Sequence, residues 1–114
     1  MAIPMSSRLD AQPSYEMANF DPDDTGLDTR IWISVKGHAR HGPRLKVVTE
    51  DKKLLSISLS LKPEIVAAPA RYRLAATSLH KVEAFIRLNL DTLLAYWHDE
   101  ITTPALVARL VRLA

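Results

Sequence analysis

Cysteine is absent from this chain of 114 residues. Its absence excludes disulfide bonds, thiolate metal ligands and cysteine nucleophiles, and it favours a reducing compartment. The first nine residues contain one arginine, two serines and one proline, and they lack the apolar run of a secretory signal. We therefore expect a cytoplasmic protein.

Glycine is also scarce, with three residues in the whole chain. A glycine-rich phosphate loop therefore does not fit, and the sequence contains neither a G-x-S-x-G nucleophile elbow nor an H-E-x-x-H metal motif. No apolar run approaches the roughly 20 residues that a membrane-spanning helix requires. These absences favour a protein that is not an enzyme and that has no catalytic residues, no cofactor, no bound metal and no membrane segment.

Charge is distributed unevenly, although the net charge is only +2. Residues 1–28 carry one basic and six acidic side chains, whereas residues 29–73 carry ten basic and three acidic ones. The first segment also contains three prolines and the turn-forming run 19–26, without a periodic apolar pattern. We interpret residues 1–28 as an acidic flexible arm and residues 29–114 as a single domain.

Apolar and polar residues alternate in three segments, near residues 30–35, 44–49 and 54–61. Such alternation is typical of an antiparallel sheet with one buried face and one face in water. Residues 64–68, which two prolines bound, can add a short edge strand. The sequence thus predicts an antiparallel sheet of three or four strands.

Apolar residues recur at spacings of three and four over residues 78–98, with Thr77 or Ser78 as the N-cap, which predicts a long amphipathic helix. Thr103, followed by proline, opens a second, short helix over 104–113. We expect an α+β fold in which both helices pack on one face of the sheet. The predicted core residues are Leu45, Val47, Leu55, Ile57, Leu59, Val82, Ile86, Leu93 and Trp97.

The acidic run D-x-D-x-T-G at residues 21–26 fits the opening of a calcium-binding helix-loop-helix. Position 12 of such a loop should be a glutamate, but here it falls on Trp32 inside a predicted strand. No helix is predicted before the run. We therefore interpret it as an acidic, solvated turn.

The basic middle of the chain contains a candidate nucleic-acid site in the hairpin over 30–46. A basic sheet face with an aromatic residue can bind phosphates and stack a base. The alternative is that Trp32 packs under the helices or the arm while the basic residues are only solvated, and the arm can also lie over this face and screen it. The candidate residues, on the strands and in the loop between them, are Arg30, Trp32, His38, Arg40, His41, Arg44 and Lys46.

Two histidines of this loop, His38 and His41, are close enough in sequence to share a metal or to act as an acid and base pair. Arg40 between them disfavours a cation, and no nearby carboxylate or cysteine supplies a third ligand. We interpret them as exposed loop histidines, with contact to an anion as the next alternative.

The C-terminal half ends in the pattern N-x-x-x-L-x-x-Y-W, followed by Glu100 and Ile101; its residues are Asn89, Leu93, Tyr96 and Trp97. With the basic strand before it, this ending resembles certain small bacterial proteins of unknown function, over residues 29–103. Some of those proteins are encoded beside a DNA-binding partner and have been discussed as toxin–antitoxin components. The resemblance implies a small sheet closed by a long helix and carries no catalytic residue over. The family's proline and histidine cluster before the second strand is missing.

Two functions are compatible with these patterns. The first is a non-enzymatic interaction module that binds a protein partner through the acidic arm or the apolar last helix. That helix can also form a homodimer seam, through Leu106, Val107, Leu110 and Val111. The second is RNA or DNA binding through the basic hairpin, with ribonuclease activity of His38 or His41 as one form of it.

Overall fold

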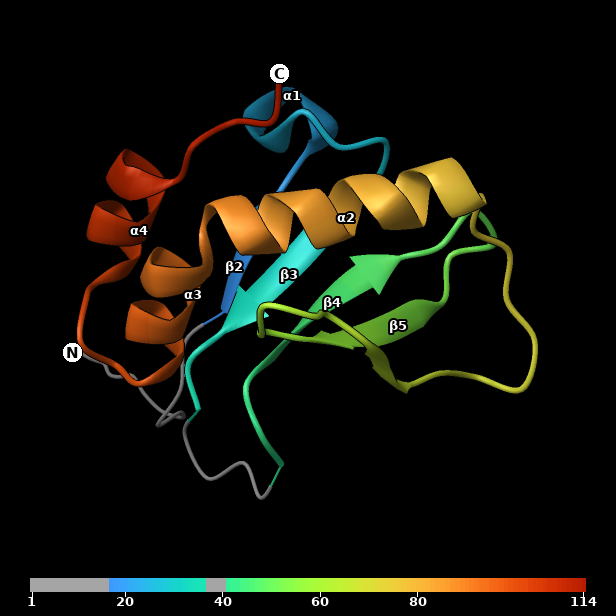
Figure 1. Ribbon diagram of the computed structural model, residues 1–114, viewed down its shortest axis with the longest axis horizontal. Coiled ribbons are helices and arrows are strands. Elements are labelled where there is room, and N and C mark those ends of the chain that lie inside the picture. The colour runs from blue at the N-terminus through green and yellow to red at the C-terminus, as the bar shows by residue number, and fades with distance from the viewer. Residues whose placement is uncertain (1–16, 37–40) are drawn as a thin grey trace, which may run out of the picture.

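The computed structural model describes residues 17–36 and 41–114. Within these ranges the chain forms five strands and four helices (Figure 1). In chain order they are β2 (Met17–Phe20), α1 (Pro22–Thr25), β3 (Ile31–Ser34), β4 (Arg44–Val48), β5 (Leu54–Ser58), β6 (Ile65–Ala67), α2 (Ala76–Leu88), α3 (Leu90–Trp97) and α4 (Thr103–Arg109).

The strands form one antiparallel sheet in the order β2-β3-β4-β5-β6. Each strand pairs with its neighbour in sequence, so the sheet is a simple meander. The register aligns Ile33 with Leu45 and Leu45 with Ile57, all of which are at most 1% exposed. Because side chains alternate between the faces of a sheet, this register places the apolar positions of neighbouring strands on the same side. The predicted α+β class is confirmed, but the sheet has five strands instead of three or four.

The additional strand is β2, which lies in the segment interpreted as an arm. It pairs with β3, and its Ala18 and Phe20 are buried. After it, α1 ends at Gly26 in a left-handed conformation, and Leu27 is 4% exposed. The predicted boundary at residue 28 is therefore wrong for residues 17–28, which belong to the domain. Residues 1–16 of the predicted arm lie outside the described residues.

The long helix predicted over residues 78–98 is divided at Asn89 into α2 and α3. Asn89 is 3% exposed and leaves the helical conformation. Its side-chain amide donates to the backbone oxygens of Phe85 and Val111, at 3.1 and 3.0 Å. Its side-chain oxygen accepts the N–H of Val111 at 2.7 Å. The break thus provides a hydrogen-bonding site for the C-terminal segment.

The last helix is shorter than predicted, because α4 ends at Arg109 and Leu110 is extended. Its N-cap is Thr102, whose hydroxyl accepts the N–H of Ala105. The chain then returns to α1, where the N–H of Leu113 donates to the oxygen of Thr25 at 2.7 Å. Figure 1 shows this C-terminal segment beside α1.

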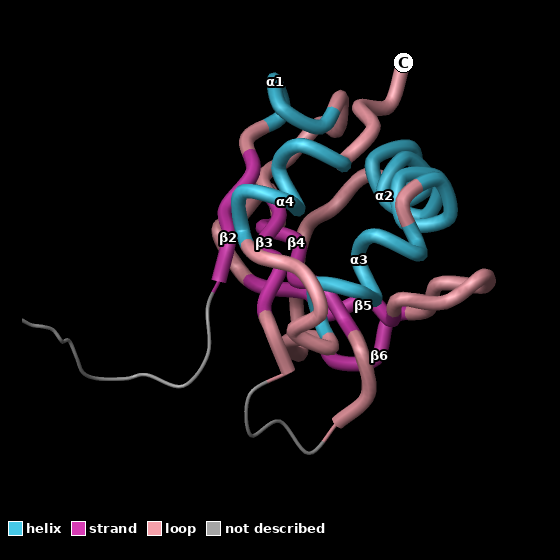
Figure 2. The backbone as a smooth tube through the Cα atoms, turned by 90° about the vertical axis from the view of Figure 1, so that its left-hand side faces the viewer, coloured by secondary structure: helices cyan, strands magenta, loops and turns pink. Residues whose placement is uncertain are grey.

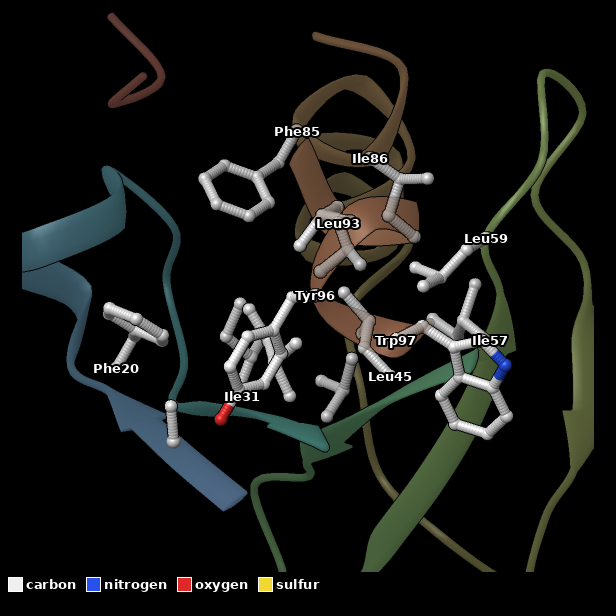
Figure 3. Close-up of a cluster of buried hydrophobic side chains, with 14 of the residues drawn as sticks. Phe20, Ile31, Leu45, Ile57, Leu59, Phe85, Ile86, Leu93, Tyr96 and Trp97 are labelled. Atoms are coloured by element: carbon white, nitrogen blue, oxygen red, sulfur yellow. The ribbon is translucent and has the colours of Figure 1, made fainter. Parts of the chain in front are cut away.

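The core lies between the sheet and the helices α2 and α3 (Figure 3). All nine predicted core residues are at most 5% exposed. The largest buried side chains are those of Trp97, Tyr96 and Phe85, and the Tyr96 hydroxyl hydrogen-bonds to that of Thr103 at 2.9 Å. Among the described residues, no helix is long and apolar enough to cross a membrane.

Candidate nucleic-acid interface

The second face of the sheet points away from α2 and α3, which lie together on one side of the strands (Figure 2). One row of this face runs across four strands, because the register pairs each of its members with the next. The row consists of Asn19, Trp32, Lys46 and Ser56, and it ends at Ser56, which is 8% exposed and lies at an irregularity in the pairing of β5 with β6. We call this row, with the outward-pointing Ser34 and Arg44 beside it, the open face.

Two cations lie at the centre of the open face. Lys46 is the cross-strand partner of Trp32, and Arg44 on the same strand pairs with Ser58. Both side chains are half-buried. No carboxylate of the described residues forms an ion pair with either of them. Their charges are therefore available to an external anion.

Arg30 directly precedes β3, and alternation along the chain places it on the same side as Trp32. Its charge is already paired with a carboxylate. Its guanidinium contacts the carboxylate of Asp21 at 2.7 Å and donates a hydrogen bond to it from Nε at 2.9 Å. Both side chains are more than half exposed. Water therefore screens the pair, and an anion can compete with Asp21 for Arg30.

Trp32 is partly exposed and lies between Asn19 and Lys46. It does not pack under α2 or α3, since its position alternates with the buried Ile31 and Ile33. Its indole Nε1 is inaccessible to solvent and has no hydrogen-bond partner. Solvent therefore reaches no polar atom of this side chain.

A cavity of about 660 Å³ adjoins the open face at the ends of β3 and β4. Trp32 belongs both to the cavity wall and to the open face, and Arg30 belongs to the wall. The wall combines apolar, polar and charged side chains; it consists of Asp21, Pro22, Asp28, Thr29, Arg30, Trp32, Val48, Thr49, Glu50, Lys52, Leu74 and Ser78.

Asp28 in this wall is held by α2. It accepts hydrogen bonds from the ammonium of Lys81 at 2.8 Å and from the hydroxyl of Ser78 at 2.9 Å. These two hydrogen bonds lower the pKa of Asp28 below its usual value. The carboxylate is therefore ionised at neutral pH, and Lys81 balances its charge.

The histidine loop is described only in part, because His38 and Arg40 lie outside the described residues. His41 is exposed, and its ring lies 5.8 Å from the ring of Trp97. The backbone oxygen of Trp97 accepts the backbone N–H of Lys36 at 2.8 Å, which joins the end of α3 to the segment after β3. His41 thus contacts a residue of the core, on the side of the sheet that carries the helices.

The apolar residues predicted to bind a partner do not form one exposed face. Leu106 is fully buried in the core, and Leu110 is half-buried against it, which corrects their assignment to the surface. The reason is that α4 packs on α3 instead of projecting from the domain. Val107 and Val111 are 57% and 52% exposed.

Sequence reasoning brought Trp32, Arg44 and Lys46 together correctly, but it missed two parts of this region. Asn19 was not assigned to the sheet because its strand lies among turn-forming residues. The cavity was not predicted because its wall joins three separate segments, residues 21–32, 48–52 and 74–78. No family model, no curated protein and no solved structure matches this chain.

Proposed function

We propose that this chain binds nucleic acid on its open face and does so without acting as an enzyme. The observation that carries the proposal is the cross-strand pair of Trp32 and Lys46, with Arg44 beside it, on a sheet face that α2 and α3 leave uncovered. Lysine and arginine bind phosphates, and an aromatic ring beside them adds stacking on a base. Both cations lack an internal ion pair among the described residues, so phosphates need displace no carboxylate.

The expected affinity depends on salt in a way that follows from the number of phosphate contacts. For single strands, log K falls with log salt by about 0.7 for each phosphate that the protein neutralises. Two contacts, at Arg44 and Lys46, give a slope of about −1.4. Raising the salt from about 50 to about 200 mM should then weaken binding roughly sevenfold.

The test is fluorescence anisotropy of labelled single-stranded RNA and duplex DNA, titrated with the protein at both salt concentrations. The double variant Arg44→Gln/Lys46→Gln should lose binding to at least one of these nucleic acids. The matched control is Arg87→Gln/Arg109→Gln, which removes the same charge from exposed positions of α2 and α4. Equal affinities of the two double variants, or no salt-sensitive binding by the wild type, would refute the proposal.

Binding of a protein partner stays a prediction, with a smaller surface than the sequence indicated. Only Val107 and Val111 of the four predicted residues are more than half exposed. Sedimentation equilibrium of the wild type and of Val107→Ser/Val111→Ser tests self-association through them. A mass that rises with concentration in the wild type but not in the variant would favour a homodimer.

Ribonuclease activity also stays a prediction. Of its two candidate histidines, His41 lies against Trp97, and His38 is outside the described residues. Incubation of labelled RNA with the wild type and with His41→Ala tests it directly.

A further inference from the structure

We infer that the cavity beside Trp32 receives one unpaired base of the bound strand, so that the protein selects single-stranded over duplex nucleic acid. This inference rests on the proposed function and names its substrate class. Its starting point is that Trp32 belongs both to the open face and to the cavity wall. A strand whose phosphates contact Lys46 therefore passes the mouth of the cavity.

The charges of the wall favour a base over a phosphate. Asp21 is paired with Arg30, and Asp28 is paired with Lys81. The remaining charged groups of the wall, Glu50 and Lys52, are opposite in sign. Because these charges cancel when Lys81 is counted, the cavity gains little by taking up a monoanionic backbone phosphate, but it does not repel a neutral base.

The wall also offers the two kinds of contact that a base requires. Apolar contact comes from Trp32 and Val48. The side chains of Glu50 and Lys52 have no hydrogen bond or ion pair among the described residues, so an acceptor and a donor remain for a base edge. A volume of about 660 Å³ lies within the range of small-molecule sites.

Single-strand selectivity follows because only an unpaired base can enter the cavity. A base inside a duplex is stacked and paired, and it reaches a pocket only after it is flipped out of the helix. An unpaired strand has no such cost. The phosphate contacts alone would not discriminate, because both forms present a phosphate backbone.

The experiment uses the full chain with three labelled probes, a ten-nucleotide single strand of RNA, the same sequence as DNA, and its DNA duplex. We expect the single strands to bind more tightly than the duplex. Trp32→Ala should weaken single-strand binding by about 5- to 150-fold, which is the range measured for loss of one stacking aromatic. Trp32→Phe should restore most of the affinity, because phenylalanine keeps a stacking ring.

A spectroscopic readout separates stacking from a merely structural role of Trp32. Trp97 is 2% exposed in the core, so quenching of tryptophan fluorescence by unlabelled oligonucleotide should come from Trp32 and disappear in Trp32→Phe. Equal binding of single strand and duplex, without quenching, would overturn the base site. The proposed function would stand in that case if Arg44→Gln/Lys46→Gln still loses binding. Absence of binding to all three probes would overturn both.

Discussion

Replacement of Asn89 by alanine removes the side chain that joins the helix break to the C-terminal segment. Three hydrogen bonds are lost, one to Phe85 and two to Val111, at 2.7 to 3.1 Å. Each such bond contributes about 0.5–1.5 kcal/mol net, and a buried group left without a partner costs about 1–3 kcal/mol. The better helix propensity of alanine returns at most about 0.7 kcal/mol. We therefore expect Asn89→Ala to lower the free energy of unfolding by about 2–4 kcal/mol.

Chemical denaturation of the wild type and of Asn89→Ala measures this difference. The variant Asn89→Asp is the informative control, because aspartate still accepts the N–H of Val111 but has no donor for the oxygens of Phe85 and Val111. Hydrogen exchange adds a local readout, since the amide of Val111 should exchange faster in Asn89→Ala, whereas Asn89→Asp keeps the acceptor for this amide and should protect it better. A loss below about 1 kcal/mol, with unchanged exchange at Val111, would refute the reasoning.

Three further predictions concern single positions. Gly26→Ala should lower stability by at least about 1 kcal/mol in thermal unfolding, because Gly26 has φ +81° and an added Cβ would clash with the backbone oxygen of Leu113. Hydrogen bonds from Thr49 and from the backbone of Arg73 lower the pKa of Asp51 to about 2. The stability that this carboxylate contributes is therefore present above about pH 4 and is lost as the pH falls towards 2. Asp51→Asn should reduce the pH dependence of the melting temperature between these two values. Asp21→Asn should free Arg30 for a phosphate and make the slope of log K against log salt steeper by about 0.7. The control Asp23→Asn removes the same charge and should leave the slope unchanged. Equal slopes of the two variants in anisotropy titrations would contradict competition between Asp21 and a phosphate.

The central strands and the core follow from local spacing alone. In β3, β4 and β5 the inward positions are isoleucine, leucine or valine at every second residue, and such a pattern is readable without knowledge of the partner strand. Five predicted core residues in or beside these strands are buried for this reason, and the four on α2 and α3 are buried because apolar residues recur there at spacings of three and four. Strand β2 has only two inward residues, Ala18 and Phe20, and its turn-forming neighbours obscure them. Its place in the sheet depends on pairing with β3.

The helix break has a similar origin. Asn89 lies in an apolar pattern that continues on both sides of it, so spacing predicts one helix over 78–98. The hydrogen-bond partner that stabilises the break, Val111, is 22 residues away. The same contact accounts for the early end of the last helix, because the N–H of Val111 donates to the side chain of Asn89 instead of to a backbone oxygen of α4.

The position of Trp32 follows from alternation, whereas its proposed role does not. Alternation places Trp32 on the face of the sheet opposite to the buried Ile31 and Ile33, and pairing of β3 with β4 then brings it beside Lys46. The cavity wall, to which Trp32 also belongs, forms only when α2 packs on the sheet and brings Leu74 and Ser78 near the turn after β4. A local pattern can therefore predict a basic face that binds phosphates, but selectivity for an unpaired base depends on the packing of segments that the sequence does not relate.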